Sequence, residues 1–218
     1  MTPAERDGLL AQAGWPPGLW RAAVPARDDA CALWPDERSG LVRARAPRRA
    51  DFVAGRIAAR AALVRMGQPV CAIPQGAGRA PVWPEGIRGS ITHAGGVAMA
   101  VVGRARDWAG LGLDLERDTP LDPDTAAAIL RPDEPATDPL ATFGAKEAAF
   151  KAQFPATGAM IGFDAARLCG DSVRLDGPGT DALPCAWRGR ALPVRHWRVP
   201  GWILSLCAVP AGAAEGAP

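Results

Sequence analysis

Apolar side chains recur at helical spacing along two long stretches of the chain. The first runs from about residue 50 to residue 66 and is expected to end at Gly67, because glycine adopts the left-handed conformation that closes a helix. Its apolar side is marked by Phe52, Val53, Ile57, Leu63 and Val64. The second stretch covers residues 136–154, and Pro155, which lacks a backbone N–H, is expected to end it. A shorter helix is expected over residues 122–130.

Other apolar runs have the length and pattern of β-strands. The unbroken run 97–102 predicts a buried strand, and the runs 111–116 and 163–168 predict two more. The segments 194–199 and 202–209 flank a Pro-Gly pair and predict a β-hairpin. Each half of the chain therefore offers a long helix and strands, which is a coarse two-fold pattern.

The remaining segments are rich in proline and glycine. Residues 1–40 show no clear period, so we expect loops and short elements there. Residues 67–87 are expected to form an ordered loop with several turns. The tail from Pro210 is expected to be loose.

The size and composition are those of an ordinary globular protein. The chain has 218 residues, 48% of them hydrophobic and 22% charged, which is enough for one large domain or two small ones. No apolar run is long enough to span a membrane, and the first residues lack a signal-peptide pattern, so we expect a cytoplasmic protein. The five cysteines are odd in number and scattered, which favours free thiols over disulfides or a zinc site.

Positive and negative charges are segregated along the chain, although the formal net charge is only +2. The segment Arg38–Arg65 contains eight arginines and one acidic residue, Asp51. The segment Asp114–Asp138 contains eight acidic residues and two arginines. A basic and an acidic region in one chain suit an anionic ligand that is held through a divalent cation.

Only two of the 25 lysines and arginines are lysines, and both lie in the stretch 143–154. Arginine stays protonated at any working pH, whereas lysine can give up its proton when its surroundings shift its pKa. Glu147 and Lys151 are four residues apart, so a helix places them on one face. They form either an ordinary salt bridge on a solvated helix or a pair that handles a proton at a reaction centre. The restriction of lysine to this stretch favours the second interpretation.

Two carboxylates are expected to point the same way from the predicted strand 111–116. Asp114 and Glu116 are two residues apart, which is the period of a strand, and leucines flank them. Paired carboxylates in an apolar setting disfavour folding unless a cation lies between them. Mg²⁺ prefers carboxylate oxygens and keeps water and phosphate as its other ligands, so a magnesium site is predicted here.

Candidate ligands for an anion lie in the basic half. Arg49, Arg56 and Arg60 recur at spacings of seven and four, and so share one helix face. That stripe is either a solvated face or a clamp for phosphate, whose oxygens match the guanidinium fork. His93 ends a strand-like run next to two glycines, and such small residues let a ligand approach the backbone closely.

Five segments together resemble the 4′-phosphopantetheinyl transferases of the larger type, which activate enterobactin and surfactin synthetases. The segments are Phe52-x-x-Gly-Arg-x-x-Ala-Arg60, Arg79-x-Pro-x-Trp-Pro84, Gly89-Ser-Ile-Thr-His93, Gly112-x-Asp-x-Glu116 and Phe143-x-x-Lys-Glu-x-x-x-Lys151. They follow the family's order and spacing over roughly residues 45–165. Thr92 stands where many members have serine, and it keeps the hydroxyl.

The resemblance implies an α+β fold of two similar halves related by a pseudo-two-fold, with coenzyme A bound between them. The halves would be residues 1–108, with basic coenzyme A-binding elements, and residues 109–218, with the carboxylates and the Lys-Glu helix. The implied reaction moves phosphopantetheine from coenzyme A to a serine of an apo carrier protein and releases adenosine 3′,5′-bisphosphate. The carrier would belong to a non-ribosomal peptide, polyketide or fatty-acid synthase, and the enzyme is expected to be a monomer that binds no nucleic acid.

The resemblance also implies a role for each matching residue. Asp114, Glu116 and Glu147 would hold Mg²⁺, or Mn²⁺, together with the pyrophosphate. Glu147 and Lys151 would handle the serine proton and the developing charge, and the sequence leaves open which of them is the base. The nucleotide and its phosphates would be held by Arg48 or Arg49, Arg56, Arg79, Thr92, His93 and Lys146.

Two other functions fit parts of the pattern. A magnesium-dependent nuclease or phosphodiesterase also uses clustered acids and a lysine, and the arginine stripe would then bind a nucleic-acid backbone. A non-catalytic module could bind nucleic acid or a carrier protein through the arginine-rich segment. That module would leave Asp114, Glu116 and Glu147 without a purpose.

Overall fold

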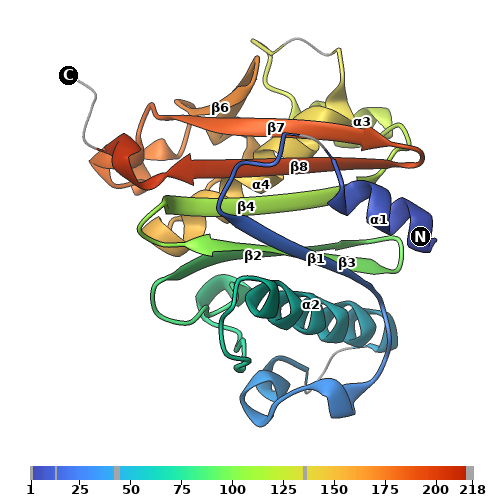
Figure 1. Cartoon of the computed structure of the whole chain (residues 1–218). Helices are drawn as coiled ribbons and strands as arrows, with labels where there is room; N and C mark the ends of the chain where they lie inside the picture. The colour runs from blue at the N-terminus through green and yellow to red at the C-terminus, as the bar shows by residue number, and fades with distance from the viewer. Residues whose placement is uncertain (1, 13, 42–44, 135–136, 215–218) are drawn as a thin grey trace.

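The computed structural model describes residues 2–12, 14–41, 45–134 and 137–214, which fold into helices packed on antiparallel sheets (Figure 1). This confirms the α+β class. The pseudo-two-fold relation between the halves and the boundary after residue 108 stay predictions. None of the described helices is long and apolar enough to cross a membrane.

The first sheet has three strands in the order β1-β3-β2, and each neighbouring pair is antiparallel. Its strands are β1 (Leu19–Pro25), β2 (Ile87–Ala94) and β3 (Val97–Arg104). The long helix α2 (Ala46–Arg65) covers one face of this sheet (Figure 1). Ala58, Ala59 and Ala62 on that helix are fully buried, and their small side chains let the helix lie close to the sheet.

The second sheet has five strands in the order β4-β8-β7-β6-β5, again antiparallel throughout. Its strands are β4 (Trp108–Arg117), β5 (Ala166–Cys169), β6 (Ser172–Leu175), β7 (Ala191–Val199) and β8 (Trp202–Pro210). Helix α4 (Pro139–Thr157) packs on this sheet, and the shorter α3 (Pro123–Ile129) contacts α4. The hairpin of β7 and β8 and the short helix α3 confirm two predictions from the sequence.

The first 40 residues contain more regular structure than expected. Helix α1 (Pro3–Leu10) begins at a capping box in which Thr2 and Glu5 satisfy each other's backbone N–H groups. β1 pairs with β3 along its whole length, so the expected short elements include a seven-residue strand of the first sheet. Its sequence mixes Trp, Arg and Ala without alternation, and its extended form depends on a partner strand about 75 residues further along the chain.

Short 3₁₀ turns connect the main elements. They are Ala30–Ala32, Pro35–Leu41, Ala77–Arg79, Phe163–Ala165, Thr180–Ala182, Cys185–Trp187 and Ala211–Ala214. The predicted strand 163–168 is therefore wrong over its first three residues, because the strand β5 begins only at Ala166. Of the predicted loose tail, residues 211–214 form a turn and residues 215–218 lie outside the described part of the chain.

Helix α2 begins earlier than predicted and buries a different side. It starts at Ala46, because Pro47 in the first turn has no N–H that would need a partner. Val53 and Leu63 are fully buried as predicted, but Val64 is 54% exposed, so its assignment to the apolar side is wrong. The helix ends at Gly67, which has a φ of 76°, as the sequence predicts.

Helix α4 begins at Pro139 and not at residue 136, which lies outside the described residues. The carboxylate of Asp138 accepts a hydrogen bond from the backbone N–H of Ala141 and so caps the start. Pro155 does not end the helix, because in the last turn it removes only one intrahelical bond. The helix continues to Thr157 and closes at Gly158 in the left-handed conformation.

Glycines on β4 allow α4 to approach the second sheet closely. A Cβ atom on Gly112 would lie 1.8 Å from the carbonyl oxygen of Ala148, and one on Gly110 would lie 2.4 Å from that of Ala152. No side chain fits at either position without moving the helix. The glycines therefore determine the distance between α4 and the strand that carries Asp114.

The two sheets lie side by side at β2 and β4, where side-chain hydroxyls join them. The Ser90 hydroxyl oxygen accepts a hydrogen bond from the backbone N–H of Leu113 at 2.9 Å. The Thr92 hydroxyl oxygen accepts one from the N–H of Leu115 at 3.1 Å. We call this line of contacts the hydroxyl seam. Met99 and Val101 of β3 and Leu113 of β4 belong to one continuous apolar core that spans the two sheets.

Candidate active site

Four charged side chains converge where α4 crosses β4. Asp114 and Glu116 extend from the strand, as predicted, and Glu147 and Lys151 extend from the helix. The Lys151 Nζ atom lies 2.5 Å from Asp114 Oδ1 and 3.8 Å from Glu147 Oε2. The salt bridge that an isolated helix would form is therefore part of a larger cluster, which we call the carboxylate cluster.

Burial and mutual repulsion perturb the acids of the carboxylate cluster. Burial, together with the negative charges of Asp114 and Glu147, raises the pKa of Glu116 to about 7 against the opposing effect of Lys151. Burial also raises the pKa of Glu147. Strongly shifted acids in a concave site are typical of functional centres.

The donor set of the cluster fits a hard divalent cation. It offers carboxylate oxygens, and Asp114 Oδ2 is buried with no hydrogen-bond partner among the described residues. A cation would satisfy that oxygen and relieve the repulsion that raises the pKa of Glu116. In the present arrangement, the described residues contain no group of three or more Asp, Glu, His or Cys side chains that could hold an ion, and the Lys151 ammonium lies against Asp114.

Two pockets lie on either side of Phe150, next to the carboxylate cluster. Each has a volume of about 210 Å³. The Met160 pocket is mainly apolar and is lined by Lys146, Glu147, Phe150, Met160, Ile161, Gly162, Phe163, Ala166 and Leu175. The Arg79 pocket is lined by Gly78, Arg79, Ala80, Pro81, Gly89, Ser90, Ile91, Phe150, Lys151, Phe154 and Pro155. Glu147 thus borders one pocket and Lys151 the other.

The backbone of Arg79 adopts an unusual conformation at the mouth of its pocket. Its φ is 66°, in the left-handed region that non-glycine residues seldom adopt, and Gly78 before it has a φ of 57°. A Cβ atom on Gly78 would lie 2.3 Å from the ring of Phe154. Strain of this kind persists where the surroundings require it, commonly at binding sites. It directs the chain so that Arg79 lines the pocket.

His93 and Arg48 lie at the edge of the cluster. The His93 Nδ1 atom is 3.4 Å from Asp51 Oδ2. Burial lowers the pKa of His93, and the charges of Asp51, Lys151 and Arg48 also act on it, so these groups share one electrostatic environment. Arg49 forms a salt bridge with Asp28. The structure therefore places His93 and Arg48 close enough to Lys151 to share its electrostatic field.

The arginine stripe on α2 does not form a solvated face. Arg56 is only 5% exposed, and its Nε atom donates to the carbonyl oxygen of Ile73 at 2.8 Å. Arg60 pairs with the fully buried Glu37. One terminal nitrogen of Arg56, Nη2, is buried without a partner among the described residues, and burial lowers the pKa of this side chain to about 10. Thr92 is likewise buried, with its oxygen engaged in the hydroxyl seam.

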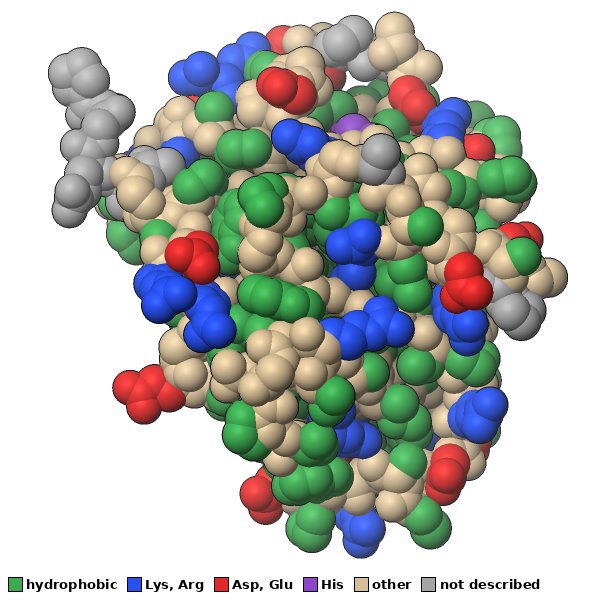
Figure 2. Space-filling view, viewed as in Figure 1, with side chains coloured by type: hydrophobic (Ala, Val, Ile, Leu, Met, Phe, Trp, Pro, Cys, Tyr) green, Lys and Arg blue, Asp and Glu red, His purple; other side chains and the backbone are tan. Residues whose placement is uncertain are grey.

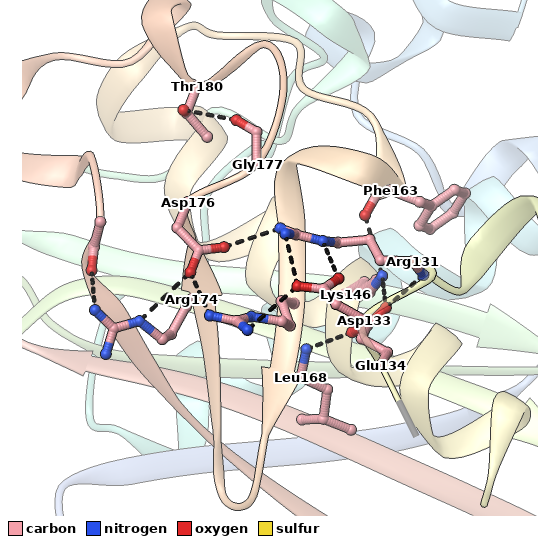
Figure 3. Close-up of polar contacts among 12 residues, drawn as sticks. Arg131, Asp133, Glu134, Lys146, Phe163, Leu168, Arg174, Asp176, Gly177 and Thr180 are labelled. Atoms are coloured by element: carbon pink, nitrogen blue, oxygen red, sulfur yellow. Dashed lines mark hydrogen bonds and ion pairs between the residues drawn. The ribbon is translucent and has the colours of Figure 1, made fainter. Parts of the chain in front are cut away.

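The ammonium of Lys146, which was expected to contact the phosphates, is engaged within the protein. Its ammonium is buried and donates to the carbonyl oxygen of Ile129 at 2.8 Å. It also donates to Glu134 Oε2 at 2.6 Å and to the carbonyl oxygen of Phe163 at 3.1 Å (Figure 3). All three N–H groups are therefore used within the protein. Glu134 also accepts from the backbone N–H groups of Arg131 and Leu168, so it joins three segments.

Glu134, Ser205 and His196 were missed as candidate residues by the sequence analysis. Glu134 is one of several acidic residues in a proline-containing segment. It is not at a helical or strand spacing from Lys146 that would predict their contact. Ser205 and His196 lie on β8 and β7, and His196 Nδ1 is 2.9 Å from Ser205 Oγ. A polar residue inside the apolar run 202–209 was the only available signal.

Comparisons with known proteins agree with the motifs. The 4′-phosphopantetheinyl transferase N-terminal domain family matches residues 36–103. The chain is 39% identical over 163 residues to 4′-phosphopantetheinyl transferase Svp from Streptomyces mobaraensis, covering 69% of this chain and 66% of Svp. It is 38% identical over 144 residues to PptT from Mycobacterium tuberculosis, covering 62% of this chain and 63% of PptT.

A further relative is matched over more of its length. The chain is 32% identical over 162 residues to 4′-phosphopantetheinyl transferase Npt from Nocardia iowensis, covering 70% of this chain and 73% of Npt. The matched regions of Svp and PptT, by contrast, span slightly less than two thirds of those proteins.

Proposed function

The chain belongs to the 4′-phosphopantetheinyl transferases, and from that premise we propose that it transfers 4′-phosphopantetheine from coenzyme A to a serine of an apo carrier protein. The observation that carries the proposal is the carboxylate cluster. It joins Asp114 on β4 to Glu147 and Lys151 on α4, next to two pockets that share Phe150 in their walls.

The two pockets match the two ends of coenzyme A. The Arg79 pocket has a guanidinium and the Lys151 ammonium at its wall, which suits the phosphates of the nucleotide. The Met160 pocket is lined mainly by apolar side chains, which suits the pantetheine arm. The pyrophosphate that connects the two ends would then lie at Phe150, next to the carboxylate cluster.

Basic residues around the Arg79 pocket would bind the nucleotide. Arg48 and His93 lie at the edge of the carboxylate cluster, which is next to this pocket. Arg49, on the same helix as Arg48, forms a salt bridge with Asp28. Arg56 supports this wall from inside through its bond to Ile73. Its Nη2 atom has no hydrogen-bond partner among the described residues, and this nitrogen could donate to a phosphate oxygen.

Asp114, Glu116 and Glu147 would hold Mg²⁺, and Mn²⁺ has the same ligand preferences. The bound ion would neutralise charge on the pyrophosphate as the bond to the leaving phosphate breaks. Lys151 lies against the same carboxylates and would supply a second positive charge beside the phosphates.

The serine hydroxyl attacks the phosphorus that carries pantetheine, the bond to adenosine 3′,5′-bisphosphate breaks, and the serine proton needs an acceptor. The Lys151 side chain is held as an ammonium between two carboxylates, and an ammonium has no lone pair for a proton. Burial raises the pKa of Glu147, which makes its carboxylate a better proton acceptor. Glu147, directly or through a water, is therefore the base in this proposal.

The rival functions explain less of the structure. A nuclease would use the arginine stripe to bind a phosphate backbone, but Arg56 and Arg60 bind partners inside the protein. On the face shown in Figure 2, Lys and Arg side chains are interspersed with apolar and acidic ones and form no continuous basic track. A non-catalytic module leaves the carboxylate cluster unexplained.

Incubation with apo carrier proteins, coenzyme A and Mg²⁺, followed by intact-mass measurement, tests the proposal directly. We expect the carrier to gain the mass of phosphopantetheine, and we expect no gain with Asp114→Asn or without a divalent cation. Carriers from peptide, polyketide and fatty-acid synthases should be compared, since the partner class is part of the proposal. A melting temperature that rises with an oligonucleotide, but not with coenzyme A and Mg²⁺, would instead support the nuclease.

A further inference from the structure

Three polar side chains form a row across the second sheet at the carboxylate cluster. His196 of β7 is directly opposite Ser205 of β8, and Ser205 is directly opposite Asp114 of β4. His196 Nδ1 lies 2.9 Å from Ser205 Oγ. Ser205 is only 1% exposed and Asp114 only 4%, so the row is shielded from water. Buried polar side chains need hydrogen-bond partners, and in this row His196 and Ser205 are partners of each other.

Gly144 of α4 leaves space over the middle of the row. A Cβ atom at this position would lie 2.5 Å from Ser205 Oγ and 3.5 Å from Asp114 Oδ2. The hydroxyl and the carboxylate oxygen therefore face the same point on the helix. Asp114 Oδ2 is the oxygen that has no hydrogen-bond partner in the described part of the chain. A buried carboxylate oxygen without a donor is costly, and the nearest hydroxyl on the neighbouring strand is that of Ser205.

The surroundings of His196 determine which of its nitrogens carries the proton. Burial lowers the pKa of His196, so the ring is neutral at neutral pH. Its Nε2 atom is buried without a partner among the described residues, and a proton there would leave a buried N–H unsatisfied. A proton on Nδ1 is instead donated to Ser205 Oγ. The Ser205 hydroxyl then keeps its own proton for another acceptor.

We propose that Ser205, oriented by His196, is a positioning residue: its hydroxyl would donate to Asp114 Oδ2 in the metal-bound site, a bond that the present arrangement does not contain, and so orient the carboxylate that binds the divalent cation. Oδ1 of the same carboxylate is contacted by Lys151 of α4. The inference rests on the proposed function, because it requires Asp114 to be a metal ligand. Partners that orient metal ligands contribute about 10- to 100-fold to metal affinity.

The test measures Mn²⁺ affinity without relying on turnover. The melting temperature of the full chain is followed against Mn²⁺ concentration at saturating coenzyme A, and a fit of the stabilisation to RT ln(1 + [Mn²⁺]/Kd) gives an apparent Kd. Ser205→Ala should raise this Kd by about tenfold or more. His196→Leu, which removes the donor to Ser205, should raise it in the same direction. His196→Asn, which can place an N–H near the Nδ1 position, should stay closer to the wild type than His196→Leu.

Ser172→Ala on β6 is the matched control, because the hydroxyl of Ser172 donates to the carbonyl oxygen of Cys169. It should leave the Mn²⁺ Kd unchanged. If Ser205→Ala lowers the metal-free melting temperature but binds Mn²⁺ like the wild type, the role is structural and the inference is overturned. If Ser205→Ala does not fold, equal Kd values for His196→Leu and His196→Asn overturn it. If Mn²⁺ does not change the melting temperature of the wild-type protein, the assignment of the metal site is overturned. This outcome is distinct from the failure of the positioning role of Ser205.

Discussion

Replacement of Lys146 by methionine is the sharpest test of the structure. The substitution keeps the length of the side chain but removes an ammonium whose three hydrogen bonds all go to buried acceptors. Glu134, whose side chain is 1% exposed, would be left as a buried charge held only by two backbone N–H groups. Removal of one member of a buried ion pair typically costs about 3–5 kcal/mol.

For a chain of this length, each kcal/mol lowers the melting temperature by about 2–4 °C, so Lys146→Met should melt roughly 6–20 °C below the wild type. A second substitution, Glu134→Gln, removes the orphaned charge and should recover a large part of the loss. Lys146→Arg should also be destabilising, because a planar guanidinium cannot reach three acceptors arranged around a tetrahedral ammonium.

The comparison variant is Lys151→Met, whose side chain is 27% exposed and which should therefore cost less stability than Lys146→Met, although it leaves the 5% exposed Asp114 side chain without its cation. Melting temperature and urea unfolding are measured for all variants, together with the KM for coenzyme A. If Lys146→Met melted within about 2 °C of the wild type while the KM rose strongly, Lys146 would be a phosphate ligand after all, and the buried ion pair would not be its main role.

Four further outcomes follow from the contacts. Asp114→Asn should abolish carrier modification while the melting temperature stays near that of the wild type, and near-normal rates at millimolar Mg²⁺ would refute the metal assignment. Lys151→Arg should retain far more activity than Lys151→Ala when kcat is compared at several pH values; a loss of about 10²–10⁴ in the Arg variant would make Lys151 the base. Gly112→Ala should cost about 1–3 kcal/mol or more of stability, because its Cβ would meet the Ala148 carbonyl at 1.8 Å, and unchanged urea unfolding would contradict that contact. Arg56→Ala should lower the melting temperature as well as raise the KM for coenzyme A, since it strips a buried carbonyl of its donor, whereas a change in KM alone would place Arg56 at the ligand.

The parts of the site that depend on local spacing were predictable from the sequence. Asp114 and Glu116 share a strand face because of the two-residue period, and Glu147 and Lys151 share a helix face because they are four residues apart. Their meeting required only that the helix pack on the strand, and Gly112 allows that approach. The restriction of lysine to this helix also drew attention to the segment from which Lys151 reaches Asp114.

The roles of the two lysines could not be separated from the sequence, because they depend on partners far along the chain. Lys146 and Lys151 are five residues apart and so point to different sides of α4. One meets Glu134 in a turn that has no regular pattern, and the other meets Asp114 across 37 positions. Arg56 was equally ambiguous, since its acceptor is a backbone carbonyl, that of Ile73, which no side-chain pattern reveals. The position of β1 within residues 1–40 could not be specified for a related reason, because its partner strand β3 is distant in the sequence.

The hydroxyl seam restricts which amino acids can replace Ser90 and Thr92 as the sequence diverges. Each oxygen must reach an amide on a neighbouring sheet at about 3 Å, so the side chain must carry its acceptor one bond from Cβ. Serine and threonine both do so, and exchange between them at position 92 is therefore neutral for the spacing of the sheets. Valine has the shape of threonine but would leave the Leu115 N–H bare, and asparagine would hold its oxygen one bond too far out. Drift at these two positions is thus limited to hydroxyl residues by the joint between the sheets, even in a descendant that had lost coenzyme A as its substrate.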